Sequence, residues 1–180
     1  MQIEKDDAVL VVVDIQERLF PHIYEYETLE NNCNILISGM KILDVPIIVT
    51  EQYSKGLGST IQSIRTSLGA IEPIEKISFS CCREASFLTA LENLEKKIIM
   101  ICGVESHVCV MQTGLDLNDR GYQTVLIEDC VSSRKPNDKF HAVERMRQAG
   151  LIVSTYEAVL FELCQVAGTE QFKAISKIVK

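Results

Sequence analysis

The stretch IIMICGVESHVCVMQ, residues 98–112, decides the fold that we predict for this chain. It begins as an uninterrupted apolar run and is broken at Gly103. A helical pattern follows, because Val108, Met111 and Leu115 recur at spacings of three and four residues. The stretch therefore reads as a strand, a tight turn and a helix.

Cys109 lies in or just before the first turn of this predicted helix. Backbone N–H groups there have no partner within the helix, and the helix dipole favours negative charge. We therefore expect a thiol with a lowered pKa that is nucleophilic at neutral pH. The competing interpretation is a small buried cysteine that fills a contact between helix and sheet.

The rest of the chain repeats this alternation of strand and helix. The predicted strands cover residues 8–13, 47–50, 72–77, 98–102, 124–127 and 151–154, with amphipathic helical patterns between and after them. Six such units predict an α/β fold, a three-layer sandwich whose six-stranded, mostly parallel sheet has the order 3-2-1-4-5-6 and helices on both faces. Without a linker or repeat, we expect a single domain over residues 1–180.

Composition narrows the class of protein. The 180 residues are 47% hydrophobic and carry a net charge of −7, which argues against a nucleic-acid-binding domain. No apolar run approaches the roughly 18 residues of a membrane span, and acidic residues precede the first apolar run, unlike a signal peptide. The seven cysteines form no C-x-x-C pair, which favours a reducing compartment. We expect a cytoplasmic protein, with an organelle left open.

Topology places three reactive side chains at one edge of the predicted sheet. In such sheets ligands bind beyond the carboxyl ends of the strands, where the strand order reverses. Asp14 ends the first strand, Cys109 follows the fourth, and Lys76 ends the third. Cys109 would be the nucleophile and Asp14 its proton acceptor, while Lys76 would stabilise charge on both. A helix cap or a solvated lysine is the ordinary alternative for Asp14 or Lys76 taken singly.

Histidine is the usual base for a cysteine nucleophile, but the three histidines fit this role poorly. His107 precedes Cys109 by two residues, which on a helix points it about 200° away. His22 and His141 have no reason in the sequence to converge on the site. We therefore prefer Asp14 as the base.

The chain resembles the isochorismatase-like cysteine hydrolases over nearly its whole length. The matching segments are VVVDIQERLF (11–20), VPIIVTEQYSKGLG (45–58), Lys76 with the following Phe79-Ser80, and the most specific one, GVESHVCV (103–110). The resemblance implies a six-stranded parallel sheet and a catalytic Asp14–Lys76–Cys109 triad. It also implies a cis peptide between Val104 and Glu105, with the N–H groups of Glu105 and Cys109 aimed at an oxyanion, and assembly into homo-oligomers.

Departures from the family pattern shape the remaining expectations. Nicotinamidases in this superfamily have a D-x-H metal motif after the second strand, where this chain has Glu51-Gln52-Tyr53, so we expect no metal and no other cofactor. The loop from Gln52 to Ser59 is interpreted as a pocket rim. Phe20, Gln52 and Tyr53 are candidate substrate contacts, with plain packing or surface as the alternative for each. Glu105 would repel anionic substrates if it faced inward.

Three functions remain open from the sequence. The leading one is a cysteine hydrolase that cleaves an amide-type C–N bond of a small-molecule substrate through a thioester on Cys109. The second is hydrolysis of a vinyl ether, as in isochorismatases themselves. The third is an interaction protein with an idle pocket.

Overall fold

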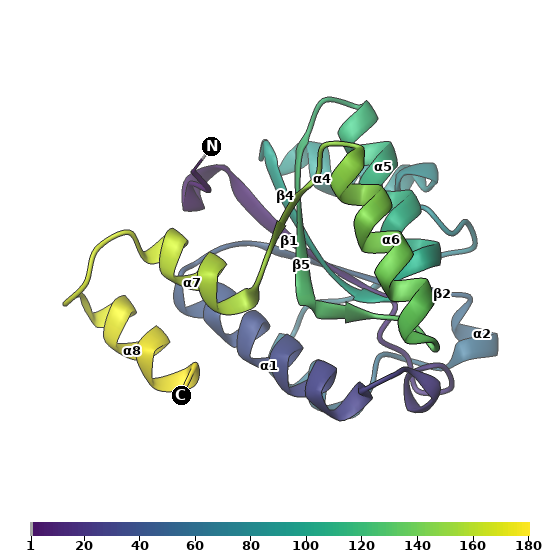
Figure 1. Ribbon diagram of the computed structural model, residues 1–180, viewed down its shortest axis with the longest axis horizontal. Coiled ribbons are helices and arrows are strands. Elements are labelled where there is room, and N and C mark those ends of the chain that lie inside the picture. The colour runs from purple at the N-terminus through teal and green to yellow at the C-terminus, as the bar shows by residue number, and fades with distance from the viewer. Residues whose placement is uncertain (1) are drawn as a thin grey trace.

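The computed structural model describes residues 2–180 and contains one six-stranded sheet (Figure 1). All neighbouring strands pair in parallel, and the order is β3-β2-β1-β4-β5-β6. This confirms the predicted fold class and strand order. The strands are β1 (Ala8–Val13), β2 (Ile47–Gln52), β3 (Ile74–Lys76), β4 (Ile98–Val104), β5 (Gln123–Ser132) and β6 (Ile152–Ser154).

Helices cover both faces of the sheet (Figure 1). One layer holds α1 (Tyr26–Ile42), α3 (Gln62–Leu68), α7 (Tyr156–Cys164) and α8 (Glu170–Ile178). The other holds α4 (Ala85–Asn93), α5 (Met111–Asp119) and α6 (Pro136–Gln148). The 3-10 turn η1 (Lys5–Asp7) precedes β1. The short helix α2 (Ser54–Leu57), the 3-10 turns η2 (Phe20–His22) and η3 (Cys81–Arg83), and the π-helical turn η4 (Ser106–Val110) lie in the connections. Across residues 2–180, every helix is too short or too polar to cross a lipid bilayer.

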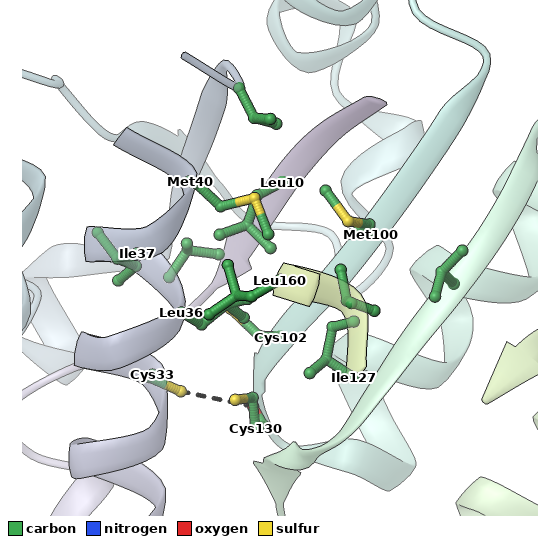
Figure 2. Close-up of a cluster of buried hydrophobic side chains, with 14 of the residues drawn as sticks. Leu10, Cys33, Leu36, Ile37, Met40, Met100, Cys102, Ile127, Cys130 and Leu160 are labelled. Atoms are coloured by element: carbon green, nitrogen blue, oxygen red, sulfur yellow. Dashed lines mark hydrogen bonds between the residues drawn. The ribbon is translucent and has the colours of Figure 1, made fainter. Parts of the chain in front are cut away.

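The central strand β1 shows why the apolar runs are continuous. All six of its residues are buried, because both faces of the sheet are covered. Leu10 and Val12 point into the core beneath α1, whereas Val11 and Val13 point into the core beneath α5. The first of these cores also holds Cys33, whose sulfur lies 3.5 Å from the carbonyl oxygen of Cys130 (Figure 2). All seven cysteines are free thiols.

The structure differs from the predicted elements in three places. Strand β4 continues through Gly103, at which φ is +117° and a Cβ atom would lie 2.1 Å from the carbonyl oxygen of Val13. This glycine therefore marks close packing of β4 against β1 and does not end the strand. Strand β5 continues past Ile127 to Ser132, with a register shift against β4. Part of the predicted loop after Gln52 is the helical turn α2.

Candidate active site

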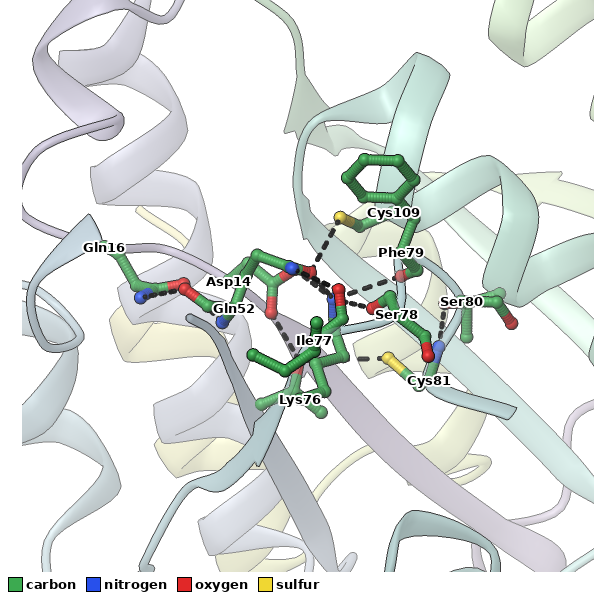
Figure 3. A network of polar contacts seen from close by, with 12 residues as sticks. Asp14, Gln16, Gln52, Lys76, Ile77, Ser78, Phe79, Ser80, Cys81 and Cys109 are labelled. Atoms are coloured by element: carbon green, nitrogen blue, oxygen red, sulfur yellow. Dashed lines mark hydrogen bonds and ion pairs between the residues drawn. The ribbon is translucent and has the colours of Figure 1, made fainter. Parts of the chain in front are cut away.

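The ends of β1 and β3 bring Asp14 and Lys76 into a buried ion pair (Figure 3). Asp14 directly follows β1 with φ of +52°, and its Oδ1 accepts a 2.8 Å hydrogen bond from the hydroxyl of Thr50 on β2. The Nζ of Lys76 lies 2.7 Å from Asp14 Oδ2, and both side chains are at most 1% exposed. Lys76 Nζ also donates to the carbonyl oxygens of Ser78 and Phe79. Each charge is therefore matched and held in place.

Gln52 at the end of β2 connects this ion pair to Cys109. Its Oε1 accepts a 2.7 Å hydrogen bond from Lys76 Nζ and lies 3.9 Å from the Cys109 sulfur. Its Nε2 donates to the carbonyl oxygen of Ile77, which fixes the amide with its oxygen toward the thiol. The backbone of Gln52 is clamped by Gln16, which accepts from its N–H and donates to its carbonyl oxygen. The buried Gln16, two residues after Asp14, therefore has a structural role, which is to hold Gln52 in place.

Cys109 lies on the π-helical turn η4 and is 6% exposed. Burial raises the pKa of its thiol well above the usual range, Asp14 raises it further, and Lys76 offsets only part of this. The expectation of a lowered pKa is therefore wrong, because burial of the sulfur is the largest influence on its pKa. In the resting site the sulfur is a neutral thiol, and a base is needed to activate it.

Lys76 keeps its proton in this setting. Burial lowers the pKa of an ammonium group, but the charge of Asp14, together with negative charge that develops on the sulfurs of Cys109 and Cys81, raises the pKa of Lys76 by more, so the net direction is upward. The site therefore holds a permanent cation beside the carboxylate. That cation can stabilise negative charge as it develops on the sulfur.

An open cavity of about 270 Å³ leads to this group. Its walls are formed by the apolar side chains of Leu19, Leu57, Phe79 and Val108 and by the polar side chains of Asp14, Gln52, Glu105, Cys109 and Arg134. The cavity therefore combines an apolar lining with several polar groups, the Cys109 thiol among them. This combination is typical of a binding site for a small organic molecule.

Two of the three predicted substrate contacts do not line this cavity. Gln52 lines it, but Phe20 is only 3% exposed and its ring packs edge-on against Tyr26. The 3-10 turn η2 rotates Phe20 inward, so that its neighbour Leu19 forms the wall. Tyr53 is 51% exposed and borders a separate surface depression.

Glu105 faces the cavity, and its charge is neutralised there. Glu105 Oε1 accepts hydrogen bonds from the backbone N–H of Arg134 at 3.1 Å and from its Nε at 2.9 Å. Sequence reasoning missed Arg134, although its position just beyond β5 places it at the same sheet edge as Asp14. The peptide bond between Val104 and Glu105 is cis. The ring of His107 contacts Ser133, at a distance of 2.9 Å, and is not among the cavity-lining residues.

Glu51 occupies the first position of the segment that replaces the D-x-H motif. It is buried, and its Oε1 accepts hydrogen bonds from the N–H and hydroxyl groups of Thr60 at 2.6 and 2.8 Å. Within residues 2–180, no group of three or more histidine, cysteine or acidic side chains gathers in a metal-binding arrangement. The polar groups that are in place suit acid–base and nucleophilic chemistry at a thiol.

Comparison with known proteins identifies the family to which the chain belongs. Residues 8–158 match the family model described as the isochorismatase domain. The secreted isochorismatase effector Isc1 of Phytophthora sojae is 36% identical over 177 residues, which cover 96% of this chain and 84% of that protein. The chain therefore belongs to the isochorismatase family, whose members are hydrolases.

Solved structures show the same fold. The MAR1 ribonuclease of Caenorhabditis elegans superposes with a TM-score of 0.94 at 33% identity, covering 99% of this chain and 92% of that chain. The YcaC gene product of Escherichia coli, described as an octameric hydrolase of unknown specificity, has a TM-score of 0.92 at 22% identity and covers 99% and 90% of the two chains. At that identity the second likeness concerns the fold alone.

Proposed function

We propose that this chain is a metal-independent cysteine hydrolase that cleaves an amide-type C–N bond of a small molecule through a thioester on Cys109. The observation that carries the proposal is the connected group of Asp14, Lys76, Gln52 and Cys109 at the end of the cavity. The ends of β1, β2 and β3 and the π-helical turn that follows β4 hold this group. A preorganised group of nucleophile, base and cation is what acyl transfer requires.

The first step forms the thioester. The Cys109 sulfur attacks the substrate carbonyl carbon while Asp14 takes the thiol proton, so that a neutral thiol becomes a bonded sulfur and the carbonyl oxygen becomes an oxyanion. We assign the N–H groups of Glu105 and Cys109 to hold that oxyanion. Lys76 keeps its charge throughout and stabilises the negative charge that passes through the sulfur.

The second step releases the amine and then the acid. Collapse of the oxyanion breaks the C–N bond, and the proton held by Asp14 goes to the leaving nitrogen, which departs as an amine or ammonia. Water then attacks the thioester carbon and loses a proton to Asp14. Breakage of the C–S bond returns that proton to the sulfur and frees a carboxylic acid. The resting thiol is thereby restored.

Two other classes of substrate, a vinyl ether and RNA, are alternatives to the amide. The family to which the chain belongs is named after isochorismate hydrolysis, so a vinyl ether substrate is the second candidate. The Caenorhabditis elegans neighbour is named a ribonuclease. We expect no RNA cleavage by this chain, because its net charge of −7 offers little attraction for a phosphate backbone.

The test is a panel of small primary amides, ureido compounds, isochorismate and a short RNA, followed by intact-protein mass spectrometry of quenched reactions. We expect an acyl adduct on the Cys109 peptide and release of ammonia or amine from members of the amide group. Cys109→Ala should lose both, whereas Cys164→Ala, a change at a distant and partly exposed thiol, should keep both. Turnover that persists without Cys109, or turnover of isochorismate with no adduct, would overturn the proposal.

We also propose that the chain forms homo-oligomers, as its Escherichia coli neighbour is described to do. Light scattering coupled to gel filtration measures the molar mass directly. A mass near 20.2 kDa at micromolar concentration would refute this assembly.

A further inference from the structure

The wall of the cavity beside Cys109 carries an ion pair that the catalytic steps leave unused. Glu105 is buried, with a side chain only 9% exposed, while the Arg134 side chain is 58% exposed. The two meet at a distance of 2.9 Å between Arg134 Nε and Glu105 Oε1. Both residues line the same cavity as the thiol.

Hydrogen bonding leaves one edge of the Arg134 guanidinium available. Glu105 engages its Nε and its backbone N–H, and no bond from Nη1 or Nη2 to any residue in the range 2–180 is present. These two terminal nitrogens form a planar fork that matches a carboxylate in bidentate geometry. The contact with Glu105 also raises the pKa of Arg134, so the fork stays charged.

The charges around the cavity are balanced before a ligand enters. Asp14 is matched by Lys76, and Glu105 is matched by Arg134. Arg134 is the cationic side chain among the residues that line the cavity. An anionic group on a ligand therefore meets a donor fork and no uncompensated negative charge.

We propose that Arg134 binds a carboxylate of the substrate and that Glu105 is a positioning residue that holds the guanidinium against the cavity wall. The substrates would then be small carboxylic acids that carry the scissile amide at a position reaching Cys109. This inference rests on the proposed function only in taking Cys109 as the reacting centre.

Two alkylating reagents of nearly equal size test the subsite without a known substrate. Iodoacetate carries a carboxylate, and iodoacetamide carries a neutral amide in its place. Timed peptide mapping measures the rate at which each reagent modifies Cys109. The iodoacetate rate is divided by the iodoacetamide rate, and this ratio is divided by the same ratio for glutathione, which corrects for the intrinsic reactivity of the two reagents. The result is called the corrected ratio. The test needs only a pH at which both reagents modify Cys109 at a measurable rate, so it remains informative even if no thioester is ever found.

The expected result is a corrected ratio that favours iodoacetate in the wild-type protein and falls by about tenfold in Arg134→Met, the loss typical of a charge-assisted pair. Arg18→Met is the matched control, because Arg18 carries the same charge and binds the nearby carbonyl oxygens of Lys55 and Gly56 without lining the cavity. Arg18→Met should leave the ratio unchanged. Equal falls in both variants, or no fall in Arg134→Met, would overturn the subsite.

Glu105 is tested by two variants that remove the same charge. Glu105→Gln retains an oxygen that can accept from Arg134, whereas Glu105→Leu does not. If Glu105 acts by holding Arg134, the ratio stays at or above the wild-type value in Glu105→Gln and falls in Glu105→Leu. Equal ratios in the two variants would refute the positioning role. Modification of Cys109 in folded wild-type protein by iodoacetamide but not by iodoacetate would refute a cavity that admits small anions.

Discussion

Replacement of Asp14 by asparagine should make Cys109 more reactive toward alkylating reagents while strongly reducing turnover. Asparagine preserves the shape of the side chain and tolerates the left-handed backbone at this position, where φ is +52°. The change removes a negative charge that raises the pKa of the Cys109 thiol, and it leaves Lys76 as an uncompensated cation. The positive charge of Lys76 then favours a negatively charged Cys109 thiolate.

The geometry sets the magnitude of the effect. Lys76 Nζ and the Cys109 sulfur lie 2.7 and 3.9 Å from the same Gln52 oxygen, so they are at most 6.6 Å apart, the sum of the two distances. At an effective dielectric constant of about 20, opposite unit charges at that distance attract by roughly 2.5 kcal/mol. Asp14 acts on the pKa of the thiol in the opposite direction and at least as strongly as Lys76 does, so the loss of its charge should lower that pKa by about two pH units.

At any pH well below the pKa of the thiol, a fall of that size in the pKa raises the thiolate fraction about a hundredfold. A less basic thiolate is also less nucleophilic, which takes back somewhat less than tenfold. Alkylation by iodoacetamide at pH 7.5 should therefore be at least about tenfold faster in Asp14→Asn than in the wild-type protein. Hydrolysis should fall by roughly 10²–10⁴-fold, because no group remains to carry the proton.

The assay is quenched alkylation between pH 6 and 9.5, read by mass spectrometry of the Cys109 peptide. Asp116→Asn is the control, since Asp116 makes a surface ion pair with Arg83 and should leave the rate unchanged. An Asp14→Asn rate equal to or below the wild-type rate would show that the charge of Asp14 does not act on the sulfur. The triad would then be wrong.

Three further changes test other parts of the structure. Lys76→Met removes the cation and should slow Cys109 alkylation at pH 7.5 by about tenfold. An unchanged rate would show that the charge of Lys76 does not act on the Cys109 sulfur. Gly103→Ala would place a Cβ atom 2.1 Å from the carbonyl oxygen of Val13 and should destabilise the fold by more than roughly 3 kcal/mol in denaturant titration. Gly168→Ala, with nothing within 4 Å, should cost only about 1 kcal/mol, so equal losses would contradict the close-packing argument. Elemental analysis of purified protein should find far less than one zinc, iron or manganese per chain, and activity that requires one bound ion would contradict metal independence.

Much of the fold followed from patterns that depend on burial alone. Strands buried on both faces require continuous apolar runs, and β1 and β4 showed them clearly. The order of the strands brought Asp14, Lys76 and the region of Cys109 to one edge without any knowledge of side-chain contacts. Asp14 and Lys76 proved to be in direct contact.

Other features depend on three-dimensional surroundings that a linear pattern does not encode. The direction of the Cys109 pKa was wrong because the degree of burial of one sulfur cannot be read from helix position. Phe20 and its neighbour Leu19 are both apolar, and only the rotation of a 3-10 turn decides which of them lines the cavity. Arg134 escaped notice because β5 was expected to end near Ile127, so the sheet edge was placed several residues too early.

The residues in and beside the cavity come from two parts of the fold that tolerate sequence change to different degrees. Asp14, Gln52 and Lys76 are tied to the ends of strands, and their hydrogen bonds couple any shift in one to the others. Leu19, Leu57 and Arg134 come from connections outside the sheet. Libraries that randomise these connections should thus be able to retune substrate choice while the acid–base machinery survives, which makes the scaffold a suitable starting point for directed evolution.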